Sequence, residues 1–335
     1  MPSFLETLID PLEAGEFANL FWDKTPFSCH SASRNIETVY SQINAISIES
    51  LFQHHDGKIR LHKINSLGQY LSVECKTLAE AQTSFANGTS VAFLNVESWL
   101  GLAQTIRDNL ANILQISPTC FECVAFATPV GSGVPFHFDG TEVLILQLYG
   151  KKTWKIAPNA VEFPTVPFAP SCVTPIIPEL ELYATPESLM VPLDKITTIE
   201  LKTGSLLFLP RGYWHETKSL ELSISLSFVS QIPSLLDLLM NAIRKHFVKI
   251  PNWRCPIRPN GICYVDIEKD LKDFAADALV SVVNSELSRL GFENKKNSTH
   301  GWLNEIRSSD ESRSENIKLY FNTDRKSVMK VKLCG

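Results

Sequence analysis

A histidine and a carboxylate stand two residues apart in the segment Pro135-Phe136-His137-Phe138-Asp139. Residues i and i+2 of a β-strand point to the same face, so the side chains of His137 and Asp139 can reach one point in space. An apolar run follows directly and favours a strand at this place. The spacing therefore suits a metal ion, which needs a further ligand from another part of the chain.

Residues 204–216 supply a candidate for that ligand. They read as a buried strand, then a Pro-Arg-Gly turn, then His215. Two histidines and one carboxylate on one face leave three coordination positions open, which is typical of non-heme Fe(II) that binds a cosubstrate and O2. The alternative is that His137 and Asp139 form a surface or capping feature and that His215 is structural. The strand after the pair and the turn before His215 favour the metal.

A lysine lies on an otherwise apolar face of the next run, residues 152–156. Lys152, Trp154 and Ile156 alternate with polar neighbours and so share one face. An inward ammonium group is costly unless an anion pairs with it, and the distal carboxylate of 2-oxoglutarate would be such an anion. The alternative is a lysine at a strand end whose ammonium group reaches solvent.

Three serines alternate with apolar residues in the run 220–228. Ser223, Ser225 and Ser227 share one face of this strand, and the opposite face carries Leu222, Ile224, Leu226 and Phe228. The serines face either solvent or a polar pocket. In the second case one of them could donate a hydrogen bond to a cosubstrate carboxylate.

The periodicity of the hydrophobic residues changes along the chain. A helical period predicts an amphipathic helix at 99–116. From residue 121 the period becomes two, and strands are predicted at 121–128, 141–149, 152–157, 204–209 and 220–229. Short strands at close spacing, without βαβ alternation, favour a sandwich or barrel such as a double-stranded jelly roll.

Less regular regions flank these strands. Residues 158–192 contain eight prolines, which predicts a long ordered loop over one end of the barrel. Beyond Pro233 the helical period returns, with helices predicted at Leu235–Phe247 and Ile267–Leu290. A short hairpin is expected within 318–334, whereas residues 28–75 show no clear period.

The bulk composition is that of a globular protein, with 44% hydrophobic and 20% charged residues. The net charge of -5 argues against a nucleic-acid binder that relies on phosphate contacts. No apolar run is long enough for a membrane span, and the N-terminus lacks the pattern of a signal peptide. The eight cysteines are scattered, which suits core cysteines in a reducing compartment and predicts a cytoplasmic protein.

Two stretches resemble the JmjC-type cupin family that contains the ribosomal oxygenases. They read TPVGSGVPFHFDGTEVLILQLYGKKTW and LLFLPRGYWHET. The first family motif is matched by His137, Asp139, Gln147, Gly150, Lys152 and Trp154, and the second by Leu207, Pro210, Gly212 and His215. The earlier stretch FANLFWDKTPF is similar to the segment before the cupin core, so the likeness covers roughly residues 15–230.

The resemblance implies a mainly β fold with flanking helices: a double-stranded β-helix core and a C-terminal helical region. Residues 1–120 would form a mixed α/β part that supports the barrel, and 121–230 the JmjC/cupin core with the catalytic site. Residues 231–295 would form the helical region through which the family dimerises, and 296–335 a polar tail or reduced C-terminal domain. The winged-helix domain of ribosomal members is expected to be absent or reduced, which argues against a ribosomal-protein substrate.

The resemblance also implies Fe(II), 2-oxoglutarate and O2 as cofactor and cosubstrates. By position, His137, Asp139 and His215 carry over as iron ligands, Lys152 as the 2-oxoglutarate anchor, and Ser225 as a second carboxylate contact. The implied activity is hydroxylation of an amino-acid side chain in a protein or peptide, including a ribosomally synthesised peptide, by a homodimer. Two alternatives stay open: an oxygenase or demethylase acting on another substrate, and a non-catalytic cupin-like binding module.

Overall fold

The computed structural model describes residues 4–255 apart from 11, 23, 31–45, 68 and 172–176, together with 285, 288–290, 320–321 and 331–332. The chain divides into two compact units, Met1–Lys245 and His246–Gly335. In the second unit, β12 (Tyr320–Phe321) pairs antiparallel with β13 (Val331–Lys332), so a pairing is found within 318–334, although residues 322–330 separate the strands instead of the expected short turn at Asn322-Thr-Asp. Most of the helix predicted at Ile267–Leu290 lies outside the described residues.

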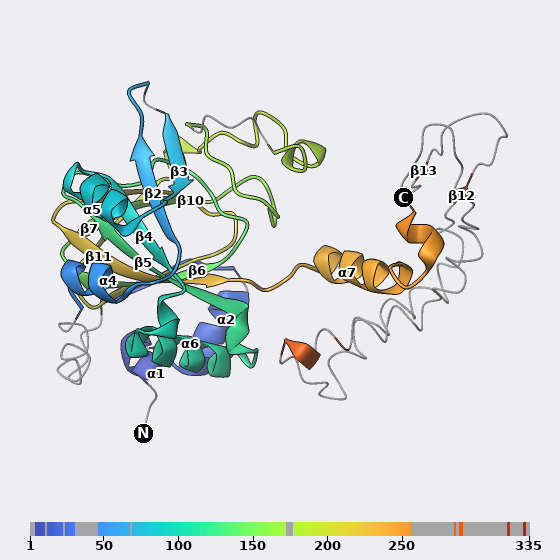
Figure 1. Cartoon of the computed structure of the whole chain (residues 1–335), viewed down its shortest axis with the longest axis horizontal. Coiled ribbons are helices and arrows are strands. Elements are labelled where there is room, and N and C mark those ends of the chain that lie inside the picture. The colour runs from blue at the N-terminus through green and yellow to red at the C-terminus, as the bar shows by residue number, and fades with distance from the viewer. Residues whose placement is uncertain are drawn as a thin grey trace. The chain divides into compact units, whose positions relative to one another are not determined.

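The first unit is built on two antiparallel sheets (Figure 1). The larger has the strand order β1-β9-β6-β11-β5-β4-β2-β3, and the smaller the order β10-β7-β8. The strands are β1 (Phe27–His30), β2 (Ile59–Ile64), β3 (Tyr70–Glu74), β4 (Ser90–Leu94), β5 (Phe121–Thr128), β6 (Val143–Tyr149), β7 (Lys152–Ala157), β8 (Thr197–Leu201), β9 (Ser205–Leu209), β10 (Trp214–Ser219) and β11 (Ser223–Ser230). The predicted jelly-roll class, mainly β with flanking helices, is confirmed.

Strand β11 lies at the centre of the larger sheet, hydrogen-bonded to β5 on one side and β6 on the other. It is buried on both faces, and Ser223, Ser225 and Ser227 are at most 5% exposed. The alternative that these serines face solvent is therefore wrong. Their hydroxyls need partners inside the protein, because a buried polar group without one costs free energy.

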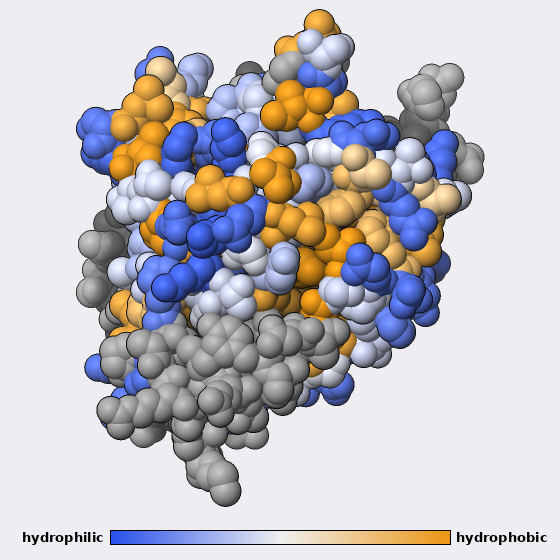
Figure 2. All heavy atoms as spheres, turned by 90° about the vertical axis from the view of Figure 1, so that its left-hand side faces the viewer, coloured by the Kyte–Doolittle hydropathy of each residue, from blue (hydrophilic) through white to orange (hydrophobic). Residues whose placement is uncertain are grey.

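Helices cover the sheet at the N-terminal end of the chain. They are α1 (Phe4–Ile9), α2 (Ala14–Trp22), α4 (Ile48–His54), α5 (Leu78–Ala86) and α6 (Gly101–Leu114). Figure 1 shows α1, α2 and α6 gathered on one side of the barrel. On the face that carries α4 and α5, hydrophilic and hydrophobic side chains are interspersed (Figure 2). Among the described residues, no helix is both long and apolar enough to cross a membrane.

Helix α6 follows the predicted amphipathic pattern. Leu102, Ile106 and Leu110, spaced by four residues, are at most 6% exposed, and the helix packs against α1. It begins at Gly101 because residues 96–98 form a separate 3-10 turn, so the predicted start at residue 99 is two residues early.

The described part of the stretch 28–75, which has no clear period, contains β1, α4, β2 and β3. Strand β2 alternates buried and exposed residues only in its first half, and β3 has one buried residue at its start, Tyr70. A polar strand at or next to the edge of a sheet, with one exposed face, shows little hydrophobic periodicity. The sequence therefore does not predict β2 and β3.

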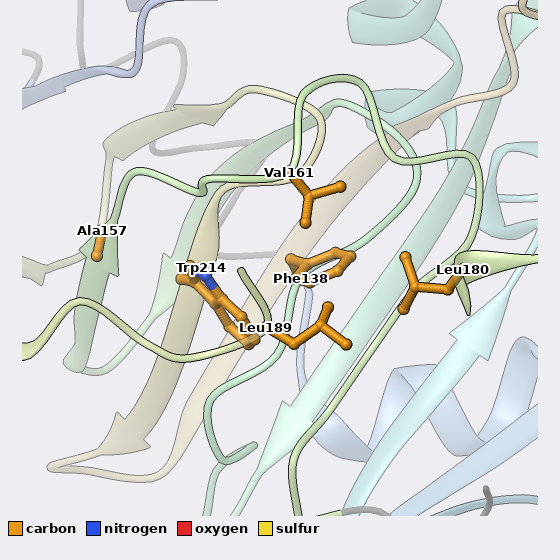
Figure 3. Close-up of a cluster of buried hydrophobic side chains, with 6 residues drawn as sticks. All are labelled: Phe138, Ala157, Val161, Leu180, Leu189 and Trp214. Atoms are coloured by element: carbon orange, nitrogen blue, oxygen red, sulfur yellow. The ribbon is translucent and has the colours of Figure 1, made fainter. Parts of the chain in front are cut away.

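The proline-rich residues 158–192 contain no strand or α-helix where they are described, and only a 3-10 turn at Leu180–Leu182. We call this segment the insertion. Its side chains Val161, Leu180 and Leu189 pack with Phe138, Ala157 and Trp214 in one buried apolar cluster, drawn in Figure 3. Phe138 lies between the predicted ligands His137 and Asp139, so the insertion packs directly on the candidate metal segment, as a loop over one barrel end should.

The cysteines that the structure describes in the barrel form no disulfide. Cys120 and Cys123 are buried, as predicted for core cysteines, and Cys29 and Cys75 are partly exposed. Cys255 is disulfide-bonded, so the expectation of reduced cysteines does not extend to this residue.

Candidate metal and cosubstrate site

The three predicted ligands come together. One ligand atom from each of His137, Asp139 and His215 lies within 4.8 Å of the other two. The Nε2 atom of His215 is 3.6 Å from the Oδ2 atom of Asp139. Atoms that each bind one ion at about 2.1 Å lie roughly 3 to 4 Å apart, so this spacing fits a shared metal.

Backbone pairing holds the two histidines side by side. His137 and His215 form an antiparallel bridge, in which the His137 N–H donates to the His215 carbonyl at 3.0 Å and the His215 N–H donates to the His137 carbonyl at 2.8 Å. The Gly212 N–H donates to the carbonyl of Asp139 at 2.9 Å. His215 lies on β10, which pairs with β7, so the predicted turn before this histidine opens into a strand.

Each histidine is also oriented by its second ring nitrogen. The Nδ1 of His137 lies 2.8 Å from the Pro135 carbonyl, and the Nδ1 of His215 lies 2.9 Å from the Tyr213 carbonyl. A carbonyl accepts only from a protonated Nδ1, which leaves Nε2 with a lone pair for a metal. Burial, reinforced by the nearby His137, lowers the pKa of His215 to about 4 despite Asp139. His215 is therefore a neutral ligand at physiological pH.

A buried carboxylate joins the segments that carry these ligands. Glu142 is 2% exposed and follows the His137–Asp139 segment by three residues. It forms salt bridges with Lys24 and with Arg211, whose Nε lies 3.2 Å from the Glu142 Oε1. Arg211 belongs to the turn that precedes His215. Burial raises the pKa of Glu142, but Lys24 and Arg211 overcome this effect and hold it below its usual value.

Replacing Glu142 with alanine should lower the free energy of unfolding by about 3 kcal/mol, because it leaves two cations without their partner in a largely buried place. Urea denaturation followed by fluorescence measures this change. Glu221→Ala is the matched control, since Glu221 pairs with Lys151 on the surface and should change stability little. Equal midpoints for the two variants would show that the Glu142 pairs contribute nothing.

Lys152 points inward, as its alternation with Trp154 predicts. It is 4% exposed, and its Nζ lies 3.2 Å from Thr128 Oγ1 and 5.8 Å from the ring centre of Phe126. Among the described residues, Lys152 has no salt bridge to a carboxylate. Burial lowers its pKa to about 8. A buried ammonium group that meets only a hydroxyl and aromatic faces is the feature that a bound anion would complete.

A small cavity of about 100 Å³ connects this lysine to the metal ligands. It is lined by Phe126, Val134, His137, Asp139, Val143, Ile145, Lys152, Trp154, His215, Thr217, Ser225, Ser227 and Val229. Ser225 is thus placed where the prediction needs it, and Ser227 lies beside it. Ser223 is not in the cavity, since its hydroxyl accepts a hydrogen bond of 2.8 Å from the Gln147 amide.

A second cavity, of about 350 Å³, reaches the ligands from the other side. Its walls come from β2, β3, β5 and the insertion, and include Arg60, His62, Tyr70, Phe126, Pro167, Phe168 and Ile177. Tyr70 stacks on His137 with ring centres 6.4 Å apart. His137 and Asp139 line both cavities. We call this second space the outer cavity and the one at Lys152 the inner cavity.

Sequence reasoning missed several of these residues. Thr128 and Tyr70 reach the site from strand ends and Thr217 from within β10, and no motif marks any of them. Glu142 and Arg211 had a usable signal, because a charged residue inside an apolar run or between a buried strand and a ligand must find a partner. The candidate ligands can therefore be identified from the sequence, whereas most residues that line the cavities can be identified only from the fold.

Residues 101–238 match the JmjC domain family. The chain is 24% identical over 257 residues to the uncharacterized protein YxbC of Bacillus subtilis, covering 75% of this chain and 78% of that protein. It is 25% identical over 270 residues to the bifunctional lysine-specific demethylase and histidyl-hydroxylase NO66 of Drosophila willistoni. That match covers 73% of this chain but 32% of NO66, so the chain spans about a third of this relative.

The fold is similar to that of YcfD, a ribosomal oxygenase from Escherichia coli whose structure contains cobalt and 2-oxoglutarate. The TM-score is 0.54 at 17% sequence identity, over 82% of this chain and 67% of YcfD. The family match spans β5 to β11 and therefore includes all three converging ligands and Lys152. Residues 101–238 of this chain are accordingly similar to a JmjC domain.

Proposed function

We propose that this protein is an Fe(II)- and 2-oxoglutarate-dependent oxygenase that hydroxylates an amino-acid side chain in a protein or peptide. The observation that carries the proposal is the open-sided triad of His137, Asp139 and His215 beside an inward lysine without a carboxylate partner. An ammonium group buried next to these three side chains destabilises the protein until an anion pairs with it, which supports a site for a carboxylate cosubstrate.

The triad would hold iron through the Nε2 atoms of the two histidines and a carboxylate oxygen of Asp139. When bound, iron supplies the oxidising chemistry by which 2-oxoglutarate and O2 yield succinate, CO2 and one oxygen atom inserted into a substrate C–H bond. The carbonyls of Pro135 and Tyr213 keep both imidazoles in the tautomer that leaves Nε2 free. The charge of Asp139 favours a cation at this point.

The inner cavity would hold the cosubstrate. Lys152 lies at its wall and would meet the distal carboxylate, with Thr128 keeping the ammonium group in place at 3.2 Å. Ser225 is 1% exposed and would donate a second hydrogen bond to the same carboxylate. Val143, Ile145 and the other apolar walls exclude water, which strengthens these charge interactions.

The outer cavity would receive the substrate side chain. Its volume of about 350 Å³ exceeds that of the inner cavity, and it shares His137 and Asp139 with it. Phe168 of the insertion and Tyr70 of β3 both line it and would place a C–H bond toward the metal. A side chain carried by a peptide can enter such an opening while the rest of the peptide stays outside.

The activities for which two similar proteins are named support this proposal. NO66 is named for both histidyl hydroxylation and lysine demethylation, and YcfD is a ribosomal oxygenase crystallised with 2-oxoglutarate. Demethylation is the second candidate, because it also starts with hydroxylation of a carbon atom. The buried Lys152 disfavours the third, a binding module without catalysis.

Two measurements test the function. Protein loaded with Fe(II) should release succinate from 2-oxoglutarate, and a randomised peptide library should yield products heavier by one oxygen atom. Absence of succinate formation would refute the oxygenase, whereas succinate together with formaldehyde release would favour the demethylase. A non-catalytic module would bind the metal and form neither product.

We further propose a homodimer that assembles through residues 231–295, and a cytoplasmic location, which the buried Cys120 and Cys123, neither of them in a disulfide, support. Helix α7 (Leu235–Phe247) lies within that region, and Leu235 at its start is 59% exposed. An apolar side chain exposed on a helix favours burial against a second copy. Light scattering should give twice the monomer mass; the monomer mass at tens of micromolar, roughly where transient dimers form, would argue against the dimer.

A further inference from the structure

The insertion and the first turns of α7 enclose an apolar groove of about 810 Å³ outside the two cavities of the metal site. We call it the insertion groove. Its apolar lining includes Leu182, Phe163 and Met240, which are 84%, 64% and 55% exposed. Leu236, one turn before Met240, is 52% exposed and also lines it. Large apolar side chains that gather around a hollow mark a binding surface.

The charged residues that line the insertion groove, among those the structure describes, are all acidic. The charged residues that line it are Glu162, Glu179 and Asp237, and no lysine or arginine is among the lining residues that the structure describes. The insertion as a whole contains four glutamates and neither lysine nor arginine between residues 158 and 192, whereas the complete chain has 31 basic residues. An occupant must therefore supply apolar side chains and positive charge.

The insertion also touches the metal segment. Phe168 pairs with Phe138 through two backbone hydrogen bonds of 2.9 and 3.0 Å. Thr165 lies close to Gly140, because a Cβ added at Gly140 would lie 2.7 Å from the backbone of Thr165. Thr165 lines the insertion groove and Phe168 lines the outer cavity. One short segment thus forms a wall of both spaces, so a single extended polypeptide could occupy them together.

We propose that the insertion groove binds a basic, apolar stretch of the peptide substrate at a distance from the residue that is hydroxylated. This inference rests on the proposed function in naming the occupant as substrate. A second copy of this chain is the other possible occupant. A two-fold interface through the groove would face its acidic lining, Glu162, Glu179 and Asp237, with the same acidic lining of the copy, and like charges at an interface oppose association. The charge therefore favours the basic peptide.

The test measures fluorescence anisotropy of labelled peptides with the full chain. A short peptide of alternating lysine and leucine should bind, and peptides of alternating glutamate and leucine or lysine and serine should bind about tenfold more weakly or not at all. Glu162→Lys and Leu182→Ser should each raise the Kd of the lysine–leucine peptide by about tenfold. Both side chains are exposed, so these variants should fold as the parent does.

Matched controls are Glu200→Lys on β8 and Leu193→Ser, which are also exposed but lie outside the groove lining. Equal affinity for the three peptides, or equal loss of binding in variants and controls, would overturn the proposal. So would a dimer that Leu182→Ser converts to monomers while no peptide binds, because the groove would then join two copies. Asp139→Ala should still bind the peptide, so a failure of the proposed catalysis does not imitate a failure of this inference.

Discussion

The variant Asp139→Ala is expected to lose stoichiometric Fe(II) binding and all decarboxylation of 2-oxoglutarate while it stays folded. Asp139 is the one carboxylate of the triad, and without it two imidazoles remain to hold a divalent cation. Its side chain is 40% exposed, so its removal leaves no large buried cavity. His137→Ala should have the same effect. Metal content by elemental analysis and succinate formation measure these losses.

Asp56→Ala is the matched control for this experiment, because Asp56 is an exposed aspartate of the same unit and is not among the ligands. It should keep parental iron content and turnover. The ligand assignment would be wrong if purified Asp139→Ala still decarboxylated 2-oxoglutarate at the parental rate. Circular dichroism spectra that match the parent's would show that a loss of metal is not a loss of fold.

Replacing Lys152 with alanine should weaken 2-oxoglutarate binding by about two orders of magnitude and iron binding far less. A buried ion pair broken on one side costs about 3–5 kcal/mol, and Lys152 is 4% exposed. The Lys152→Arg variant should be milder, since a guanidinium group still meets a carboxylate, although its planar fork needs more room than the inner cavity of about 100 Å³ readily offers.

Titration of 2-oxoglutarate into the iron-loaded variants, followed by calorimetry, gives these affinities directly. Lys155→Ala is the control, because Lys155 lies on the same strand with its side chain outside and paired with Glu216 at 2.9 Å. An unchanged 2-oxoglutarate affinity in Lys152→Ala would remove this lysine from the site. A parallel loss of iron and cosubstrate in this variant would instead point to a general collapse of the inner cavity.

The shared face of His137 and Asp139 and the central strands were predictable because their signals are local. The period of two in 121–128 and 152–157 is that of β5 and β7 with the same bounds, and Leu235–Phe247 is helix α7 as predicted. The pair His137 and Asp139 needs no long-range information, since the spacing of two residues already puts both on one face. Lys152 was predictable for the same reason, as its neighbours on that face are apolar.

The rest depends on contacts between distant parts of the chain. Strand β10 has the sequence Trp-His-Glu-Thr-Lys-Ser, which is too polar to show a hydrophobic period, and it forms because β7 provides a partner. The choice between Ser223 and Ser225 could not be made from alternation, because both share one face. The hydrogen bond from Gln147 occupies Ser223, and a cross-strand contact of this kind is invisible in the sequence.

The backbone bridge between His137 and His215 has a consequence for the loss and recovery of the metal. Both imidazoles are held by hydrogen bonds that need no ion, two along the backbone and one from each ring. Removal of iron with a chelator should therefore leave the barrel folded, whereas a zinc finger unfolds when it loses its ion. Bound iron would then stabilise the folded protein only by mass action. The metal-free protein could bind iron again without refolding.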